Sequence, residues 1–227
     1  MFKNLSLKVI VFGFIFTFFS SFGQSFFLGI FNTSIRETLS ITHGQFGSIY
    51  ASATLCSSLL LIWVGKKIDD INIFRFAIYV TLLLSFSCLF FSKISSIVFL
   101  FIAIFLMRFS GQGLMSHTAT TTVSRYFTKS RGRALSICWF GLSSAEFILP
   151  VLMVFLLSLT TWQNIWTVIA ILILIFLPIA SFFLVRTVKL DTRESTEGEE
   201  FKEENIKQWK RIEVLKDYKF YIVSMNM

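Results

Sequence analysis

Long apolar runs, separated by short charged segments, set the pattern of the chain. Six runs are uncharged or nearly so, at about 9–35, 38–65, 76–92, 94–124, 134–159 and 165–185. A transmembrane helix needs about 20 mainly apolar residues, so each run can form one span. Residues 147–185 carry no charge and are too many for one span, and 160–164 divide them. The pattern predicts an all-α membrane protein with six transmembrane helices.

Positive charge alternates along the connecting segments. The start of the chain and the segments after the second, fourth and sixth runs hold 2, 3, 4 and 9 Lys and Arg residues, whereas the other three hold 1, 1 and 0. Cytoplasmic segments of membrane proteins carry the excess of Lys and Arg. The alternation therefore predicts that both termini lie in the cytoplasm.

Composition supports a membrane protein and excludes other classes. Hydrophobic residues make up 55% of the 227 positions, which is more than a soluble domain of this size uses. The formal charge of +8 does not indicate nucleic-acid binding, because the basic residues stand between apolar runs. The three cysteines lie in apolar runs without metal-ligand spacing. We expect the lipid bilayer of the cell membrane (inner or plasma) as surroundings, and no metal, cofactor or nucleic acid.

One charge lies in the middle of the fourth run. Arg108 is the only charged residue among about 31 between Lys93 and Arg125. A cation near mid-depth costs about 3 kcal/mol on insertion scales, and such residues usually face a bundle interior or a wet cavity, where they have a partner or a ligand. At about 100° per residue, Gln112 shares the face of Arg108, whereas His117 lies roughly opposite. We expect His117 to hydrogen-bond a neighbouring helix, with a proton relay as the alternative.

Two more polar residues stand near mid-depth in other runs. Gln24 lies in the first run, and Glu146 lies in the fifth, about twelve residues after Arg133. The fourth and fifth spans are joined by a short loop and run antiparallel, so Arg108 and Glu146 form a natural pair. Two roles are open: these residues line a cavity together with Gln24, or Arg108 and Glu146 form a structural ion pair between the two helices.

The fourth run also carries a recognisable motif. The pattern Arg108-x-x-Gly111-Gln112-Gly113, followed by the basic loop that ends at Arg133, looks like the fourth helix and following cytoplasmic loop of a major facilitator superfamily transporter. The two glycines stand one position earlier than in the common form of that motif. The resemblance implies a transporter, and substrate identity cannot be carried over from it.

A second segment resembles the same superfamily. The stretch from Gly65 to Arg75 is similar to the superfamily's loop between helices two and three, Gly-x-x-x-Asp-Arg-x-Gly-Arg-Arg, with Gly65 and Asp69 matching. A carboxylate there can cap a helix N-terminus or pair with an arginine, which holds one conformational state. The resemblance implies a conformational latch that comprises Gly65, Asp69, Arg75, Arg131 and Arg133.

The resemblance implies a fold as well. Each half of the superfamily consists of two inverted three-helix repeats, and the substrate lies at mid-depth between two six-helix halves. We expect residues 1–186 to form the N-terminal six-helix half, 187–208 an acidic cytoplasmic linker, and 209–227 an interfacial helix with the truncated start of a seventh helix. The missing C-terminal half is then an expected partner.

The implied function is secondary active transport of a small solute by alternating access, with an organic anion as the candidate substrate. In this hypothesis Arg108 attracts the anionic group, Gln24 and Gln112 hydrogen-bond it, and Glu146 pairs with Arg108 or carries a coupling proton. One alternative is a half-size transporter that works as a homodimer. An intramembrane enzyme is disfavoured, because the histidines, cysteines and Glu146 have no nucleophile–base or metal spacing.

Overall fold

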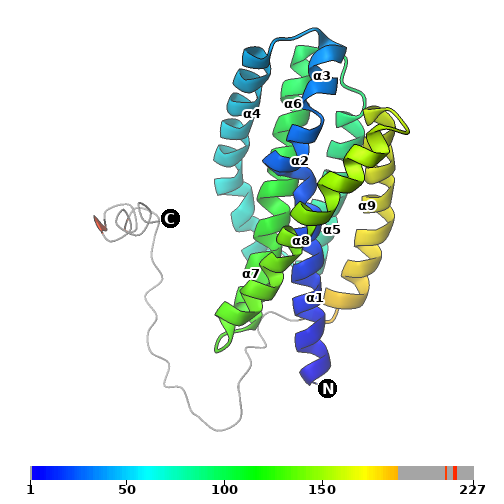
Figure 1. Cartoon of the computed structure of the whole chain (residues 1–227). Helices are drawn as coiled ribbons and strands as arrows, with labels where there is room; N and C mark the ends of the chain where they lie inside the picture. The colour runs from blue at the N-terminus through cyan, green and yellow to red at the C-terminus, as the bar shows by residue number, and fades with distance from the viewer. Residues whose placement is uncertain (1, 189–212, 214–216, 219–227) are drawn as a thin grey trace. The chain divides into compact units, whose positions relative to one another are not determined.

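The computed structural model describes residues 2–188, 213, 217 and 218, with side chains from Ser6 onward (Figure 1). Within these residues the secondary structure is helical, without a strand. The chain divides into two units, Met1–Glu194 and Ser195–Met227. The predicted linker from residue 189 onward and the predicted start of a seventh helix lie outside the described residues, apart from Glu213, Asp217 and Tyr218.

Six helices in the described part are long and apolar enough to cross a membrane, which confirms the predicted six spans. The elements in chain order are α1 (Phe2–Ser20), η1 (Ser21–Gly23), α2 (Ser25–Ile30), α3 (Asn32–Leu39), α4 (His43–Val64), η2 (Gly65–Asp69), α5 (Ile73–Phe91), α6 (Ile97–Met107), η3 (Arg108–Met115), α7 (Ser116–Tyr126), α8 (Arg131–Leu157) and α9 (Trp162–Val185). The first span consists of α1, η1 and α2, and the fourth consists of α6, η3 and α7. Both are therefore interrupted helices.

Polar side chains in the connecting segments determine where helices begin. Thr42 and Gln45 form a capping box at the start of α4, in which each side chain bonds the backbone N–H of the other. Ser96 and Thr161 each accept a hydrogen bond from the backbone N–H three residues further on, which satisfies an otherwise unpaired donor of the first helical turn. These caps fix the first residues of α4, α6 and α9.

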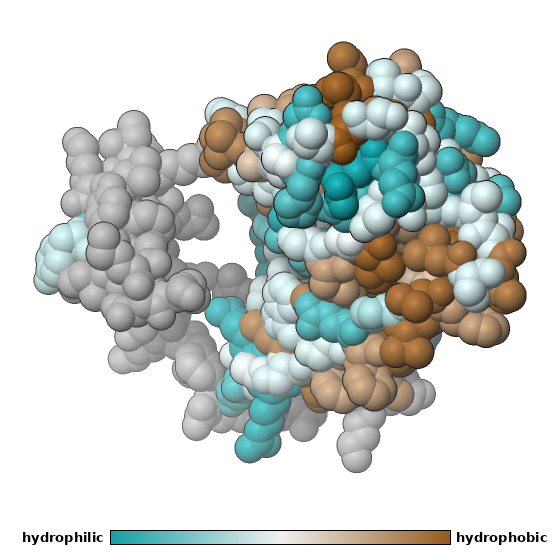
Figure 2. All heavy atoms as spheres, turned by 45° about the horizontal axis from the view of Figure 1, so that its top comes forward, coloured by the Kyte–Doolittle hydropathy of each residue, from teal (hydrophilic) through white to brown (hydrophobic). Residues whose placement is uncertain are grey.

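The spans alternate in direction along the bundle (Figure 1). The first residues of α1 and the last residues of α9 lie at the same end as η2 and the α7–α8 connection; we call it the η2 end. The opposite end, which bears α3 and the α8–α9 connection, is called the α3 end. Figure 2 turns the α3 end forward, and hydrophilic residues gather there while hydrophobic residues gather over the flank. This distribution fits a bundle whose flanks lie in lipid.

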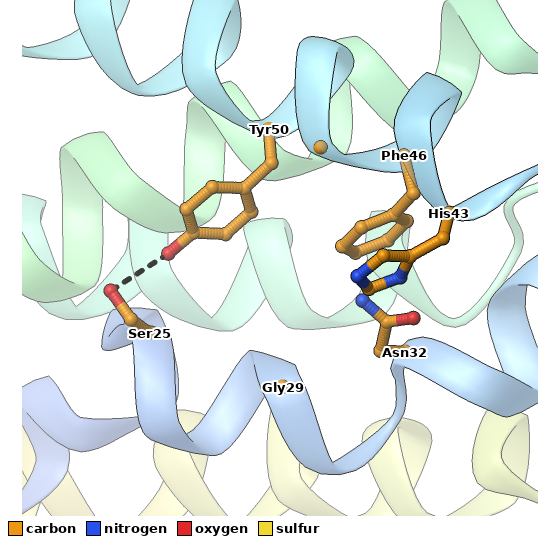
Figure 3. A pocket seen from close by; sticks show the side chains of 7 residues that line it. Ser25, Gly29, Asn32, His43, Phe46 and Tyr50 are labelled. Carbon is orange, nitrogen blue, oxygen red and sulfur yellow. Dashed lines mark hydrogen bonds between the residues drawn. The ribbon is translucent and has the colours of Figure 1, made fainter.

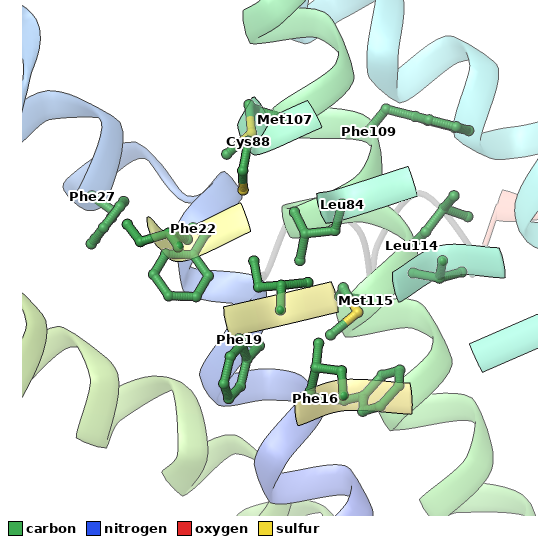
Figure 4. Close-up of a cluster of buried hydrophobic side chains, with 14 of the residues drawn as sticks. Phe16, Phe19, Phe22, Phe27, Leu84, Cys88, Met107, Phe109, Leu114 and Met115 are labelled. Carbon is green, nitrogen blue, oxygen red and sulfur yellow. The ribbon is translucent and has the colours of Figure 1, made fainter. Parts of the chain in front are cut away.

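Aromatic and aliphatic side chains fill the middle of the bundle. Phe16, Phe19 and Phe22 of the first span meet buried side chains of α5 and the fourth span, including Leu84 and Met115 (Figure 4). Towards the α3 end, three rings surround the buried Trp166 of α9 at centroid distances of 4.6–5.3 Å; they belong to Phe27 of the first span, to Phe31 directly after it, and to Phe91 of the third. Ring contacts thus link the first, third and sixth spans.

Small residues let α1 and α8 approach closely. A Cβ atom on Gly141 would lie 2.2 Å from the carbonyl oxygen of Phe14 and 2.4 Å from Oγ1 of Thr17. The hydroxyl of Thr17 donates a hydrogen bond to the carbonyl of Cys138. Close packing of small residues with interhelical hydrogen bonds is typical of membrane helices, and here it joins the first span to the fifth.

The spans differ in how much of their surface the bundle covers. In the most apolar 18-residue window of each span, 11% of residues are buried in α4 and 22% in α8, against 39–56% in the other four spans. The exposed side of α4 carries both small polar residues, such as Ser52 and Ser58, and large apolar ones, such as Leu55 and Trp63. The bundle therefore leaves α4 and α8 as its two least covered helices.

Candidate functional site at Arg108

The interruption of the first span exposes a backbone acceptor inside the bundle. Gln24 adopts an extended conformation, with φ −82° and ψ 156°, so the helix does not continue directly from η1 into α2. The carbonyl of Gly23 therefore lies at a helix end, where backbone acceptors lack intrahelical partners. A helix C-terminus also carries a partial negative charge. This site suits a cation.

The interruption of the fourth span supplies that cation. Arg108 is the first residue of η3, a π-helical segment, and only 7% of its surface is exposed. Its Nη1 atom donates to the carbonyl of Gly23 at 3.1 Å and to Oγ of Ser25 at 3.2 Å. The guanidinium carbon lies 5.4 Å from the ring centroid of Tyr50, within cation–π range. A backbone carbonyl, a hydroxyl and a ring face thus hold the charge.

Two glycines permit the close contact between the interrupted spans. A Cβ atom on Gly23 would lie 2.3 Å from the carbonyl oxygen of Met107 and 2.8 Å from Cα of Gly111. A Cβ atom on Gly111 would lie 2.7 Å from both N and Cα of Gly23. Because the obstructing atoms belong to the backbone, they cannot move aside as a flexible side chain would. Only glycine fits at both positions, and this contact keeps Arg108 within reach of the end of η1.

The π-helical segment changes which residues of the fourth span share a face. Nε2 of His117 lies 3.0 Å from the carbonyl oxygen of Gly65, in η2 directly after α4. Arg108 and Gln112 also line a cavity with residues of α4, so these three side chains face the second span. The predicted hydrogen bond from His117 to a neighbouring helix is confirmed. Its predicted position on the face opposite Arg108 is wrong. A π-helix has more residues per turn than an α-helix, so each extra residue rotates all later side chains about the helix axis by about 100°.

A cavity of about 250 Å³ lies beside Arg108, and we call it the central cavity. It is lined by Thr54, Ser57, Ser58 and Leu61 of α4 and by Arg108, Gln112 and Gly113 of η3. Two polar atoms of its lining residues, Nε of Arg108 and Oγ1 of Thr54, are buried without a hydrogen-bond partner. Buried polar groups are normally satisfied. The central cavity therefore has unused hydrogen-bonding capacity beside a positive charge.

The other two predicted substrate-binding residues occupy different surroundings. Gln24 is half-buried at the interruption between η1 and α2. Glu146 lies on α8 and is exposed. No ion pair joins Arg108 to Glu146 in the part of the chain that the structure describes, because the guanidinium of Arg108 turns towards α2 and α4 instead. Of the four residues, the structure brings Arg108 and Gln112 together in one cavity.

A second cavity, of about 240 Å³, lies between α2, α3 and α4; we call it the α3-end cavity (Figure 3). Its lining consists of Ser25, Gly29, Asn32, His43, Phe46, Gly47 and Tyr50. The Tyr50 hydroxyl donates to Oγ of Ser25 at 2.9 Å. Tyr50 thus lines the α3-end cavity and contacts Arg108, which lines the central cavity. Ser25 and Tyr50 carry no signal in the sequence, because their contacts depend on the interruption of the first span.

The predicted latch residues lie at the η2 end, with an additional partner. Asp69 forms an ion pair with Arg125, the last basic residue of α7. Arg131 uses its Nε to donate to the carbonyl of Ser124 at 3.1 Å, while Arg75 and Arg133 are exposed. The sequence shows a basic segment that begins at Arg125 and ends at Arg133. It does not show which of its residues pairs with Asp69, because Asp69 and Arg125 are 56 positions apart.

The fold and the surroundings of Arg108 define a class of protein. The described chain forms six membrane-capable helices with a buried cation beside a polar cavity, and the first span is broken at Gln24 next to that cation, where it exposes a backbone carbonyl. Interrupted membrane helices that expose backbone groups at mid-depth are typical of secondary transporters. The arrangement is that of a membrane transport protein.

Comparison with protein families gives the particular family. The family model described as Major Facilitator Superfamily matches residues 13–225, so the chain belongs to this superfamily. Searches of curated proteins and of solved structures gave no match. Membership makes the protein an integral membrane protein for the transport of a small solute, in a family whose members are transporters and not enzymes.

Proposed function

We propose that the protein serves secondary active transport of a small organic anion by alternating access, with Arg108 as the group that binds the anion. The buried Nε of Arg108, which has no hydrogen-bond partner, carries this proposal. A guanidinium has five N–H donors, and both hydrogen bonds that the structure gives Arg108 use Nη1. An anionic group in the central cavity would satisfy the remaining donors.

The charge balance around Arg108 supports substrate binding over a structural ion pair. The partners of Arg108 are a carbonyl, a hydroxyl and a ring, which stabilise the cation without neutralising it. Within the described residues no carboxylate pairs with it. Intramembrane charges are expensive, pair with one another or with backbone carbonyls, and mark substrate or ion pathways. Neutralisation by a bound anion therefore gives Arg108 a role that its protein contacts do not fill.

The remaining residues take supporting roles in this proposal. Gln112 lines the central cavity beside Arg108, and its amide can donate to the second oxygen of a carboxylate. Gln24 stands at the interruption of the first span and contributes when the cavity changes shape. Glu146, which is exposed on α8, carries a coupling proton in this proposal.

We further propose that α4 and α8 pack against a second six-helix half. Substrates of such transporters are held between two halves, and these two helices are the least covered of the bundle. The C-terminal half of a superfamily member fits this role, and a homodimer of half-size transporters would use the same face. In this proposal the membrane is the inner or plasma membrane of the cell, and the η2 end and both termini face the cytoplasm. The alternating Lys and Arg counts support this orientation.

The latch belongs to the same cytoplasmic face in this proposal. The Asp69–Arg125 pair joins η2 to the end of α7, and His117 joins the fourth span to Gly65 nearby. Together they hold the second and fourth spans at the η2 end in one conformational state. Arg75, Arg131 and Arg133 provide alternative partners for Asp69 when that end opens.

Equilibrium binding to the purified chain in lipid nanodiscs tests the proposal. Isothermal titration with acetate, benzoate and succinate should reveal binding of at least one of these anions. The Arg108→Gln variant should weaken that binding about tenfold or more, since charge-assisted hydrogen bonds are lost. The Arg186→Gln variant, at the exposed end of α9, serves as the control. Equal affinity of the wild type and Arg108→Gln for every bound anion would contradict the proposal.

A further inference from the structure

The two ends of the α3-end cavity carry hydrogen-bond donors that are each bonded to an arginine. At one end the hydroxyls of Ser25 and Tyr50 face each other, and at the other end Asn32 lies beside His43 (Figure 3). Arg108 donates to Ser25 from outside the cavity, and Nε of Arg36 donates to Oδ1 of Asn32 at 2.7 Å. Neither arginine lines this cavity itself.

At the Ser25–Tyr50 end, one hydroxyl proton is not used in the hydrogen bonds among Ser25, Tyr50 and Arg108. Arginine is a donor only, so Oγ of Ser25 must accept from Arg108. The single hydrogen bond between Ser25 and Tyr50 uses the proton of one hydroxyl. Tyr50 donates in this bond, so the proton of the Ser25 hydroxyl stays unused. One O–H group therefore remains available at the cavity wall.

The Asn32 end has a donor for a similar reason. Because Arg36 can only donate, the Asn32 atom that it bonds must be the amide oxygen, which fixes the orientation of the amide. The amide NH₂ group therefore points the other way, and in Figure 3 the nitrogen of Asn32 lies on the side of His43. This end of the cavity thus also presents N–H donors.

The surroundings favour a negatively charged ligand. Each donor group is polarised by an arginine bonded behind it, and such hydrogen bonds to anions are stronger than neutral ones. No Asp or Glu lines the cavity. Between the two donor ends the wall is formed by Gly29, Gly47 and the ring of Phe46, which suits an apolar body.

The spacing of the donor ends indicates the shape of the ligand. Ser25 and Asn32 are seven positions apart on two consecutive helices, and at about 1.5 Å per residue their backbones are about 10 Å apart. We propose that the α3-end cavity is a second binding site, for a dicarboxylate with a short methylene body whose carboxylates bind at the Ser25–Tyr50 end and at Asn32. The proposal rests on the proposed transport of organic anions and names the class of anion.

The position of this site relates it to the central cavity. The ring of Tyr50 forms part of its wall and lies over the guanidinium of Arg108. A dicarboxylate in the α3-end cavity is therefore separated from the central cavity by Tyr50 and Arg108. The site is a waiting position from which a dicarboxylate reaches Arg108 once the Ser25–Tyr50 hydrogen bond opens.

Titration with three six-carbon ligands tests the inference on the full chain in nanodiscs. The ligands are adipate, hexanoate, which has one carboxylate, and adipamide, which is uncharged. We expect adipate to bind about tenfold or more tightly than hexanoate, and adipamide to give no measurable binding. Adipate that binds no more tightly than hexanoate, or not at all, would overturn the inference. The proposed function is tested separately, by the titration with acetate, benzoate and succinate.

Variants locate the bound adipate. The single changes Ser25→Ala and Tyr50→Phe should each weaken adipate binding less than threefold, because one hydroxyl remains, whereas the double variant should weaken it about tenfold. Asn32→Ala should also cost about tenfold. The matched controls Ser143→Ala, Tyr79→Phe and Asn164→Ala change exposed residues on α8, α5 and α9 and should have no effect. Size-exclusion profiles and melting temperatures identify any variant that does not fold.

A variant of the central cavity separates the two sites. Gln112→Ala changes a residue that lines the central cavity and not the α3-end cavity, so it should weaken adipate binding less than Asn32→Ala does. If Gln112→Ala weakens adipate binding while Asn32→Ala does not, adipate occupies the central cavity. That result would overturn the second site and would support the proposed role of the Arg108 region in anion binding.

Discussion

Nη1 of Arg108 lies 3.1 Å from the carbonyl oxygen of Gly23, so the end of one interrupted helix holds the cation of another. The two interruptions depend on each other. Gln24 turns the first span out of helical geometry and leaves the Gly23 carbonyl without a helical partner, and η3 places Arg108 against it. A helix C-terminus stabilises a cation by about 0.3–1 kcal/mol in exposed sites and by more when partly buried. This contact offsets part of the cost of placing an arginine inside the membrane.

The contact between Gly23 and Gly111 predicts a steric effect on stability. Gly111→Ala places a Cβ atom 2.7 Å from backbone atoms of Gly23, and overpacking of this kind costs about 1–3 kcal/mol. Thermal unfolding in detergent should show a clear decrease in melting temperature. Gly132→Ala is the matched control, because a Cβ atom there meets no atom within 4 Å, and alanine favours a helix. Equal melting temperatures for both variants would contradict the close contact.

The sequence was sufficient for the architecture but not for the local geometry of the site. Six apolar runs of suitable length predict six spans, because lipid requires every backbone group to be satisfied within a helix. The π-helical turn at Arg108 was not predictable from the same pattern, since one additional residue per turn leaves no mark in an apolar run. The shared cavity of Arg108 and Gln112 agrees with the predicted face, whereas the position of His117 does not. Long-range partners such as Gly23 and Tyr50 follow from tertiary packing.

The exposure of Glu146 predicts that its charge contributes little to stability. Removing one partner of a buried ion pair costs about 3–5 kcal/mol, whereas substitutions on an exposed surface usually change stability by less than about 0.5 kcal/mol. Glu146 is exposed and does not pair with Arg108 among the described residues. The melting temperature of Glu146→Gln in detergent should therefore equal that of the wild type. A large decrease would show that the ion pair between the fourth and fifth spans does form.

The Asp69–Arg125 pair predicts a small but specific coupling energy. Both side chains are partly exposed, at 44% and 37%, and such pairs contribute about 0.2–1 kcal/mol. A double-mutant cycle with Asp69→Asn and Arg125→Gln, measured by thermal unfolding at low salt, should give a coupling within this range that decreases as salt is added. Asp70→Asn is the control, because the neighbouring Asp70 is exposed and has no ion pair in the described part of the chain. An equal coupling between Asp70 and Arg125 would rule out a specific latch contact.

Arg108→Lys separates the charge of Arg108 from the geometry of its guanidinium. Lysine keeps the positive charge, but its three N–H donors radiate from one nitrogen, so an ammonium that bonds Gly23 and Ser25 lacks the separate Nε and Nη2 donors of the guanidinium. Affinity for any carboxylate that the wild type binds should therefore decrease about tenfold, since about 1.4 kcal/mol corresponds to a factor of ten. The melting temperature should decrease less than it does in Arg108→Met, which leaves the Gly23 carbonyl without its partner. Arg186→Lys, at the end of α9, is the control for replacing an arginine by a lysine outside the site. Wild-type affinity in Arg108→Lys would mean that the central cavity attracts anions by charge alone, without the directed hydrogen bonds proposed here.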